Sequence, residues 1–149
     1  MAIAAVTAAS LVLAADGGLS PGIISFRNDA TVLQAQGRHG APGPLVGDLL
    51  ALRGHGVTDL AAALRTAAAQ LATVTADERV VLLVSDCLPT AGGDPGLALT
   101  GISRLHVLCP LPTTESERAS AALARRGHGL SQPLRTLADV APALTRVLG

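Results

Sequence analysis

Short apolar runs alternate along the chain with longer segments rich in alanine and leucine. Three of these runs, residues 22–26, 80–85 and 105–109, contain branched apolar side chains and predict buried strands. The turn at residues 27–30 predicts a β-hairpin between the first run and residues 31–33. Strands that alternate with helices indicate a mostly parallel sheet that is covered on both faces.

Apolar spacing and capping residues predict the helices. After Thr58, the expected N-cap, five residues share one helical face: Leu60, Leu64, Ala67, Ala68 and Leu71. Thr114 and Glu117 have the spacing of a capping box, and Gly127 stands where a glycine often ends a helix. The last helix has its own apolar stripe: Leu137, Val140, Leu144 and Val147.

This order of elements predicts one α/β domain over residues 1–149, with a doubly wound, Rossmann-like sheet and one antiparallel edge strand. Residues 1–15 contain no basic residue and are too short to span a bilayer, so we expect a buried helix there in preference to a secretory signal. Residues 37–44, rich in glycine and proline, are predicted as a loop. In doubly wound sheets, ligands bind beyond the carboxyl ends of the strands.

The composition excludes several classes of function. Eleven basic residues balance eleven acidic ones, which argues against a surface for nucleic acid or anionic membranes. The single aromatic residue, Phe26, excludes a base-stacking platform, and the absence of lysine excludes a Schiff-base or P-loop lysine. Cys87 and Cys109 are too few for a disulfide framework or a four-thiolate zinc site, which favours a reducing, cytoplasmic compartment.

Two segments place candidate chemistry at the carboxyl ends of the predicted strands. Asp86 directly follows the run 80–85, where a carboxylate suits a hard-cation ligand or a general base, or starts the turn before Pro89. Residues 53–60 form a glycine-rich loop that opens onto a helix and could cradle phosphate, although its spacing matches no nucleotide motif. Alternatively, Thr58 caps that helix and Asp59 favours its positive end.

Together these motifs resemble the von Willebrand factor type A (VWA) domain. That family has a glycine-rich loop ending in Thr-Asp before a helix, as in residues 54–60, and a strand running into Ser-Asp-Gly-x-Pro-Thr, as in residues 80–90. The hairpin and the segment 105–126 fit the same order, so the resemblance covers nearly the whole chain. It implies a metal-ion-dependent adhesion site, whose Mg²⁺ is held by an Asp-x-Ser-x-Ser loop, a threonine and an aspartate. The last two match Thr58 and Asp86.

The chain lacks one part of that pattern. No Asp-x-Ser-x-Ser occurs, and residues 2–15 resemble the helix that follows this loop, so we expect either an N-terminally truncated reading frame or a degenerate domain. The family's central first strand would then be absent, which leaves unpaired strand edges or makes its neighbours pair directly. With only Thr58 and Asp86, the affinity for Mg²⁺ is expected to be poor.

Cysteine and histidine positions give further expectations. Cys87 stands where the family has glycine, which predicts that the backbone there does not need a positive φ. Cys109 is expected to end the neighbouring strand, and both cysteines are expected to be small buried residues and not a redox pair. His55 is expected to be exposed in its loop, and His106 to be packed or hydrogen-bonded within a strand.

The resemblance implies a cytoplasmic, bacterial protein-binding module. Its partner would present an acidic residue, and AAA+ ATPases are frequent partners of intracellular family members. We expect no enzymatic activity and no nucleic-acid or membrane partner. One alternative is a small α/β hydrolase that uses Ser85, Asp86 or Cys87, against which the lack of a nucleophile elbow argues. Another is a remnant that binds no partner.

Overall fold

The structure is a computed structural model in which residues 2–13, 20–26, 29–38, 42–51 and 58–149 are described. Along the chain the elements are α1 (Ala2–Leu13), β1 (Ile23–Phe26), β2 (Ala30–Gln34), α2 (Pro42–Ala51), α3 (Leu60–Leu71), β3 (Val80–Val84), η2 (Pro95–Ala98), β4 (Arg104–Pro110), α4 (Thr114–Arg126), β5 (Ser131–Leu134), η3 (Leu137–Asp139) and α5 (Val140–Leu148). Helices and strands alternate as predicted, and only the short 3-10 helix η2 lies between β3 and β4.

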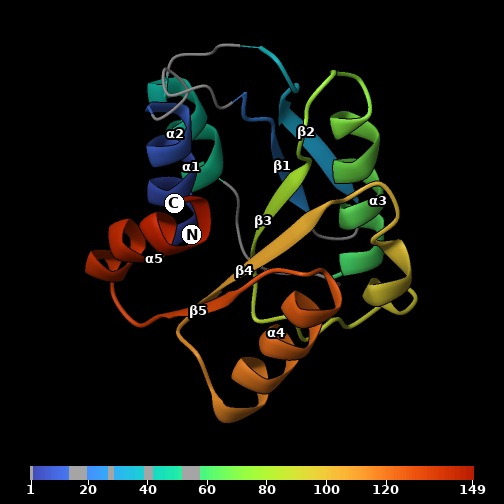
Figure 1. The fold of residues 1–149 in the computed structure, drawn as a ribbon. Helices are drawn as coiled ribbons and strands as arrows, with labels where there is room; N and C mark the ends of the chain where they lie inside the picture. Colours follow the sequence, from blue (N-terminus) through green and yellow to red (C-terminus); the bar gives the residue numbers. More distant parts are fainter. Residues whose placement is uncertain (1, 14–19, 27–28, 39–41, 52–57) are drawn as a thin grey trace.

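The described strands form two sheets. β3, β4 and β5 pair in that order and in parallel, with Val81 opposite Leu105 and Val107 opposite Ser131. β1 and β2 form a separate antiparallel pair, which confirms the predicted hairpin. In Figure 1 this pair lies on the β3 side of the parallel sheet. The predicted α/β fold class is confirmed, although the antiparallel strand β2 pairs with β1 in a separate sheet and not at an edge of the parallel sheet.

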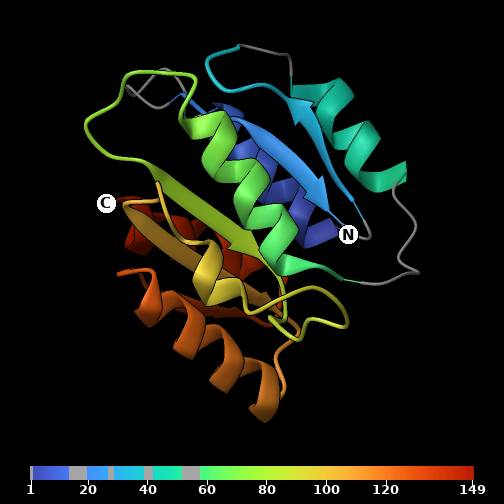
Figure 2. The ribbon, with the colours of Figure 1, turned by 90° about the vertical axis from the view of Figure 1, so that its right-hand side faces the viewer.

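Helices cover both faces of the strands. Figure 2 shows α3 in front of them and α1 behind. On the α3 side, Leu60 of α3, Leu105 of β4 and Leu123 of α4 belong to one apolar cluster. On the other side, two clusters involve α1, α2 and α5: Ala5, Ala8, Ile23, Leu45 and Leu49, and Leu108, Leu134, Val140, Ala143 and Leu144. Among the described helices, none combines the length and apolarity that a bilayer crossing needs.

β4 lies at the centre of the parallel sheet. Every residue from Leu105 to Cys109 is buried, which confirms the buried strand predicted there. Side chains alternate between the faces, so Val107 joins the cluster beneath α3 and α4 whereas Leu108 packs towards α5. The same prediction for β3 is only partly right, because Leu83 is its one buried residue and the others are half-buried.

The link from α4 to β5 passes very close to β4. Gly127 ends α4 as predicted, and its carbonyl oxygen accepts the Leu105 N–H at 2.8 Å. A Cβ on Gly129 would collide with the backbone carbonyl group of Leu105. This contact sets the register of β5, in which the Leu130 carbonyl oxygen accepts the Val107 N–H at 2.9 Å. Glycine is therefore required at position 129 for space.

Two predicted helix starts were wrong. α2 begins at Pro42, inside the segment 37–44 that was predicted as a loop, because proline is well suited to the first turn of a helix. α3 is capped by Asp59 and not by Thr58, since the Asp59 Oδ1 atom accepts the Ala62 N–H at 2.9 Å. The Asp59 carboxylate therefore caps α3, where the sequence had predicted the Thr58 hydroxyl.

The cap of α4 also lies one residue from its predicted place. The Thr113 hydroxyl accepts the Ser116 N–H at 3.2 Å, and Ser116 Oγ accepts the Thr113 N–H at 2.8 Å. This reciprocal pair is a capping box in which serine replaces the usual glutamate. The box predicted at Thr114 and Glu117 is therefore wrong by one position.

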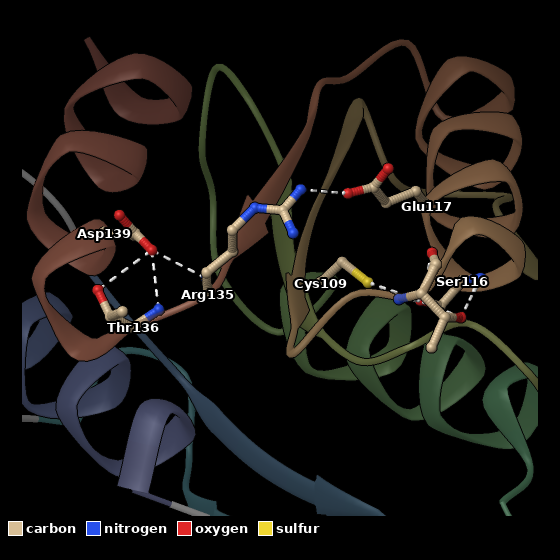
Figure 3. Close-up of polar contacts among 7 residues, drawn as sticks. Cys109, Ser116, Glu117, Arg135, Thr136 and Asp139 are labelled. Carbon is tan, nitrogen blue, oxygen red and sulfur yellow. Dashed lines mark hydrogen bonds and ion pairs between the residues drawn. The ribbon is translucent and has the colours of Figure 1, made fainter.

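The stripe predicted for the last helix is largely confirmed. Val140, Leu144 and Val147 are buried in α5. Leu137 is 50% exposed because it belongs to η3, whose tighter winding turns its side chain off the stripe. Figure 3 shows the start of this segment, where Asp139 Oδ2 accepts the N–H of Thr136 at 2.8 Å.

Candidate functional site

The loop before α3 and the loop after β3 are tied together at the carboxyl end of the sheet. The Thr58 N–H donates to Thr90 Oγ1 at 2.8 Å. In return, the Thr58 carbonyl oxygen accepts the N–H groups of Thr90 and Ala91 at 3.1 and 3.3 Å. These bonds join positions 32 residues apart in the chain. Thr58 is thus fixed against the segment that carries Asp86.

Asp86 lies at the exposed start of that segment. Its Oδ1 atom accepts the Leu88 N–H at 3.0 Å, which makes an Asx turn directly after β3. The turn agrees with the structural interpretation of Asp86, and the exposed carboxylate also remains accessible to a partner. We use the name rim for Thr58 and the segment 86–92, which the hydrogen bonds between Thr58 and Thr90 join to each other.

Thr90 and Gly92 are rim residues to which the sequence interpretation gave no role. Gly92 has a φ of 83°, and a Cβ there would collide with the Asp59 carboxylate. Glycine therefore lets the loop pass close over the cap of α3. Thr90 is the last residue of the Ser-Asp-Cys-Leu-Pro-Thr motif. The motif therefore pointed to this threonine, but it did not reveal the hydrogen bonds that Thr90 makes to Thr58.

The expectation for the backbone at Cys87 was wrong. Its φ is +55°, a left-handed conformation that favours glycine. The Cys87 N–H donates to Ser85 Oγ at 3.1 Å, and this local bond supports the turn. Cysteine therefore occupies the position in a strained conformation, and the tight turn is kept.

The thiol of Cys87 is buried and unreactive in character. Burial raises the pKa of Cys87 to about 11, so the thiol stays protonated at neutral pH. Ser85 is also buried, with 8% of its surface exposed. A hydrolase nucleophile needs an accessible and activated oxygen or sulfur, and neither side chain is placed or tuned in that way.

Cys109 is buried as well, as predicted. Its Sγ donates to Ser116 Oγ at 3.5 Å, which links the end of β4 to the cap of α4 (Figure 3). Both cysteines are unpaired thiols. Cys87 belongs to the apolar cluster that contains Leu60 and Leu123, and both cysteines are buried, which agrees with the interpretation of both as small buried residues.

The described residues contain few donors for a metal ion. No group of three or more histidine, cysteine, aspartate or glutamate side chains comes together in those ranges. Thr58 and Asp86 would supply one hydroxyl and one carboxylate, whereas Mg²⁺ demands near-octahedral coordination by oxygen. This donor set does not fit a tight Mg²⁺ site. The glycine-rich residues 52–57, which include His55, lie outside the described residues.

His106 is a packed strand residue, as predicted. It is 3% exposed, and its Nδ1 atom accepts the Leu130 N–H at 3.0 Å. Burial lowers the pKa of His106, with the nearby Arg104 guanidinium as a further cause, so the ring is held neutral. An accepting Nδ1 then places the ring proton on Nε2. The hydrogen bond ties β4 to the start of β5, and His106 lies away from the rim.

Two ion pairs attach α4 to its surroundings. Arg126 Nη1 lies 2.9 Å from Asp94 Oδ1, and Arg135 Nη2 lies 3.0 Å from Glu117 Oε1 (Figure 3 shows the second). The Gly96 N–H and then Arg126 lower the pKa of Asp94. Arg126 and Asp94 lie 32 residues apart in the chain, so no local sequence pattern predicts their pairing. Both pairs are exposed and contribute little to stability.

Sequence comparison finds no relative. No protein-family model matches the chain, and no curated protein shows a significant match. Solved structures do resemble it, and the sequence identities of those described below are between 14 and 17%. At such identities the likeness establishes the fold and not the activity.

Three structural neighbours span almost the whole chain. An aerotolerance-related membrane protein from Bacteroides fragilis, carrying multiple mutations to serine, is 17% identical, with a TM-score of 0.69 over 95% of this chain and 86% of that one. The conserved hypothetical protein BatB from Bacteroides thetaiotaomicron is 14% identical, with a TM-score of 0.65 over 96% and 85%. A von Willebrand factor type A protein from Catenulispora acidiphila is 14% identical, with a TM-score of 0.69 over 97% and 37%. The chain therefore has a VWA-like fold.

Proposed function

We propose that the chain is a protein-binding module whose rim, which includes Thr58 and Asp86, contacts a partner protein. The VWA-like fold supports a protein-interaction role. The observation that carries the proposal is the set of hydrogen bonds between Thr58 and the segment 90–91, because it holds two loops in one fixed surface beside an exposed carboxylate. That surface lies beyond the carboxyl ends of the strands, where ligands of such sheets bind.

In this proposal the side chains of the rim contact the partner directly. Asp86 offers a carboxylate to N–H or guanidinium donors, and its Asx turn fixes where that carboxylate stands. The acidic partner residue and the Mg²⁺ ion implied by the resemblance stay predictions, and no part of the proposal depends on the ion. An AAA+ ATPase is the proposed class of partner, on the resemblance alone.

Asp86→Asn is expected to weaken partner capture about tenfold or more, which corresponds to about 1.4 kcal/mol. Asparagine keeps the oxygen that accepts the Leu88 N–H, so the turn is preserved while the charge is lost. The measurement is quantitative mass spectrometry of proteins retained from native lysate by the immobilised chain. The proteins that depend on residue 86 are then examined for AAA+ ATPases.

Asp77→Asn is the matched control. Asp77 is also an exposed carboxylate, but it precedes β3 and so lies at the opposite end of the sheet. It should retain the same proteins as the unaltered chain. An identical set of proteins on the unaltered, Asp86→Asn and Asp77→Asn chains would contradict a binding role for the rim.

Isothermal titration with MgCl₂ is expected to show no binding at submillimolar concentrations. The reason is the small donor set, one hydroxyl and one carboxylate, among the described residues. Submillimolar binding that disappears in Asp86→Ala would overturn this expectation and bring metal-assisted capture back into the mechanism. The partner-capture experiment is independent of that outcome.

A further inference from the structure

His106 lies at the point where β5 joins the parallel sheet. β5 is a strand of four residues, and β4 is its one partner among the described strands. Figure 1 shows it along the side of β4 that faces away from β3. Two hydrogen bonds hold Leu130, directly before β5: its carbonyl oxygen accepts the Val107 N–H at 2.9 Å, and its N–H donates to His106 Nδ1 at 3.0 Å. An imidazole ring therefore holds the start of this strand together with the backbone.

The bond between Leu130 and the ring requires a neutral imidazole. A neutral ring has one acceptor nitrogen and one donor nitrogen, whereas an imidazolium has two donors. On protonation, Nδ1 would carry a hydrogen that faces the hydrogen of the Leu130 N–H, with the two nitrogen atoms 3.0 Å apart. Two donors cannot form a hydrogen bond, so the protonated ring does not fit the closed arrangement.

The second ring nitrogen gives a proton no better place. His106 Nε2 is buried and has no hydrogen-bond partner within the part of the chain that the structure describes. The side chain is 3% exposed, so bulk water scarcely reaches it. An imidazolium there would be a buried charge without a partner, which is costly. The ring can therefore take up a proton only if the structure around it opens.

The elements packed on this face of β4 bring little charge to the ring. His106 shares the face with Leu108, whose cluster contains residues of α1, β3, β5 and α5. The described residues of α1, β3 and β5 include no titratable side chain. α5 has Arg146, which donates to Gln132, and η3 has Asp139, which accepts backbone N–H groups next to its own helix. No carboxylate of these elements is free to pair with an imidazolium.

The remaining charges act from the ends of the strands. Arg104 at the start of β4 pairs with Glu78, and His128 lies exposed in the link before β5. Burial, and after it the Arg104 guanidinium, lowers the pKa of His106 below its ordinary value of 6.5, while Glu78 acts in the opposite direction. A ring released into water regains the ordinary pKa and binds a proton at higher pH than the closed ring. The stability of the closed arrangement is thus fully present above about pH 6.5 and is lost as the pH falls through the lowered pKa.

We propose that His106 is a pH-sensitive switch between β4 and β5, in which uptake of one proton by the ring releases the Leu130 N–H and opens the start of β5. The pairing of β3 with β4 stays intact, because it consists of backbone bonds such as that from the Ser85 N–H to the Leu108 carbonyl oxygen, at 3.1 Å. The switch lies away from the rim, so this inference does not rest on the proposed function.

The test is amide hydrogen exchange of the full chain, followed by NMR from about pH 8 to about pH 5. Exchange is expressed as a protection factor, which removes the pH dependence of the intrinsic rate. Leu130 is expected to lose protection about tenfold per pH unit below the pKa of His106, as release linked to one proton requires. The Ser85 amide is the internal reference and should keep its protection. The Cε1 chemical shift of His106 should titrate over the range in which Leu130 loses protection.

His106→Asn separates the hydrogen bond from the titration. The asparagine Oδ1 is attached to Cγ, as Nδ1 is in histidine, so it can accept the Leu130 N–H but takes up no proton in this range. Protection of Leu130 is expected to become independent of pH. His128→Asn is the matched control, because it makes the same change at an exposed position of the adjoining link. It should keep the pH dependence of the unaltered chain.

Three results would overturn the proposal. One is an equal loss of protection at Leu130 and Ser85, which would show global acid unfolding. Another is constant protection of Leu130 while the His106 ring titrates. The third is a pH-dependent loss at Leu130 that persists in His106→Asn. Circular dichroism checks that this variant folds, and if it does not, the ring titration and the exchange of Leu130 and Ser85 in the unaltered chain decide the question.

Discussion

Leu60→Ala is expected to lower the free energy of unfolding by about 2–5 kcal/mol. Leu60 has no exposed surface and lies at the first position of α3, in the cluster shared with β3, β4 and α4. Alanine would leave a cavity there that the neighbouring elements can fill only partly. Urea denaturation followed by circular dichroism measures the change, with the slope of the transition checked for constancy.

Leu97→Ala is the matched control for this substitution. Leu97 lies in η2 and is 78% exposed, so the same truncation should change the free energy of unfolding by less than about 0.5 kcal/mol. The described core would be wrong if the two substitutions had equal effects. Leu60 directly follows Asp59, the N-cap of α3. Partner capture by the Leu60→Ala variant is therefore compared only under conditions in which that variant is folded.

Gly129→Ala is expected to destabilise the chain by about 3 kcal/mol, through overpacking against backbone that cannot move. The added Cβ would meet the carbonyl group of Leu105, which sits in the buried strand β4. Relief would require β5 to shift away from β4 and would break the bond between the Val107 N–H and the Leu130 carbonyl oxygen. At roughly 2–4 °C per kcal/mol for a chain of this size, thermal unfolding should show a clear decrease in Tm.

Gly93→Ala controls for the loss of glycine flexibility. No atom lies within 4 Å of a Cβ built on Gly93, so alanine there should be neutral or slightly stabilising. A Tm for Gly129→Ala equal to that of Gly93→Ala would show that the approach of residue 129 to Leu105 is looser than described.

Local sequence patterns predicted the elements well where side-chain periodicity decides them. The run 105–109 is a buried strand because its residues meet strands on two sides and helices on both faces. β3 has an even more apolar sequence but only one partner among the described strands, so its burial depends on neighbours that no local pattern reveals. α3 shows the same limit, since Leu60 and Leu64 are buried while Ala67, Ala68 and Leu71 are half-buried.

The candidate site was predicted in its parts and not in its connections. Order and spacing of motifs singled out Thr58 and Asp86, and the structure ties the first to the loop that carries the second. The connection is the hydrogen bond between Thr58 and Thr90, which are 32 residues apart in the chain. This bond can form only when the sheet is folded, so no local pattern predicts it. At Cys87 the residue type was a misleading guide, because the turn imposes a φ of +55° regardless of the side chain.

The hydrogen bonds between Thr58 and the segment 90–91 bear on the thermodynamics of recognition. Flexible loops lose conformational entropy when a ligand orders them, and that loss subtracts from affinity. Here the folding of the chain has already ordered the backbone that follows Asp86, through its own Asx turn and the hydrogen bond between Thr58 and Thr90. Association at this surface therefore begins from a preorganised backbone, and affinity depends chiefly on side chains and solvent.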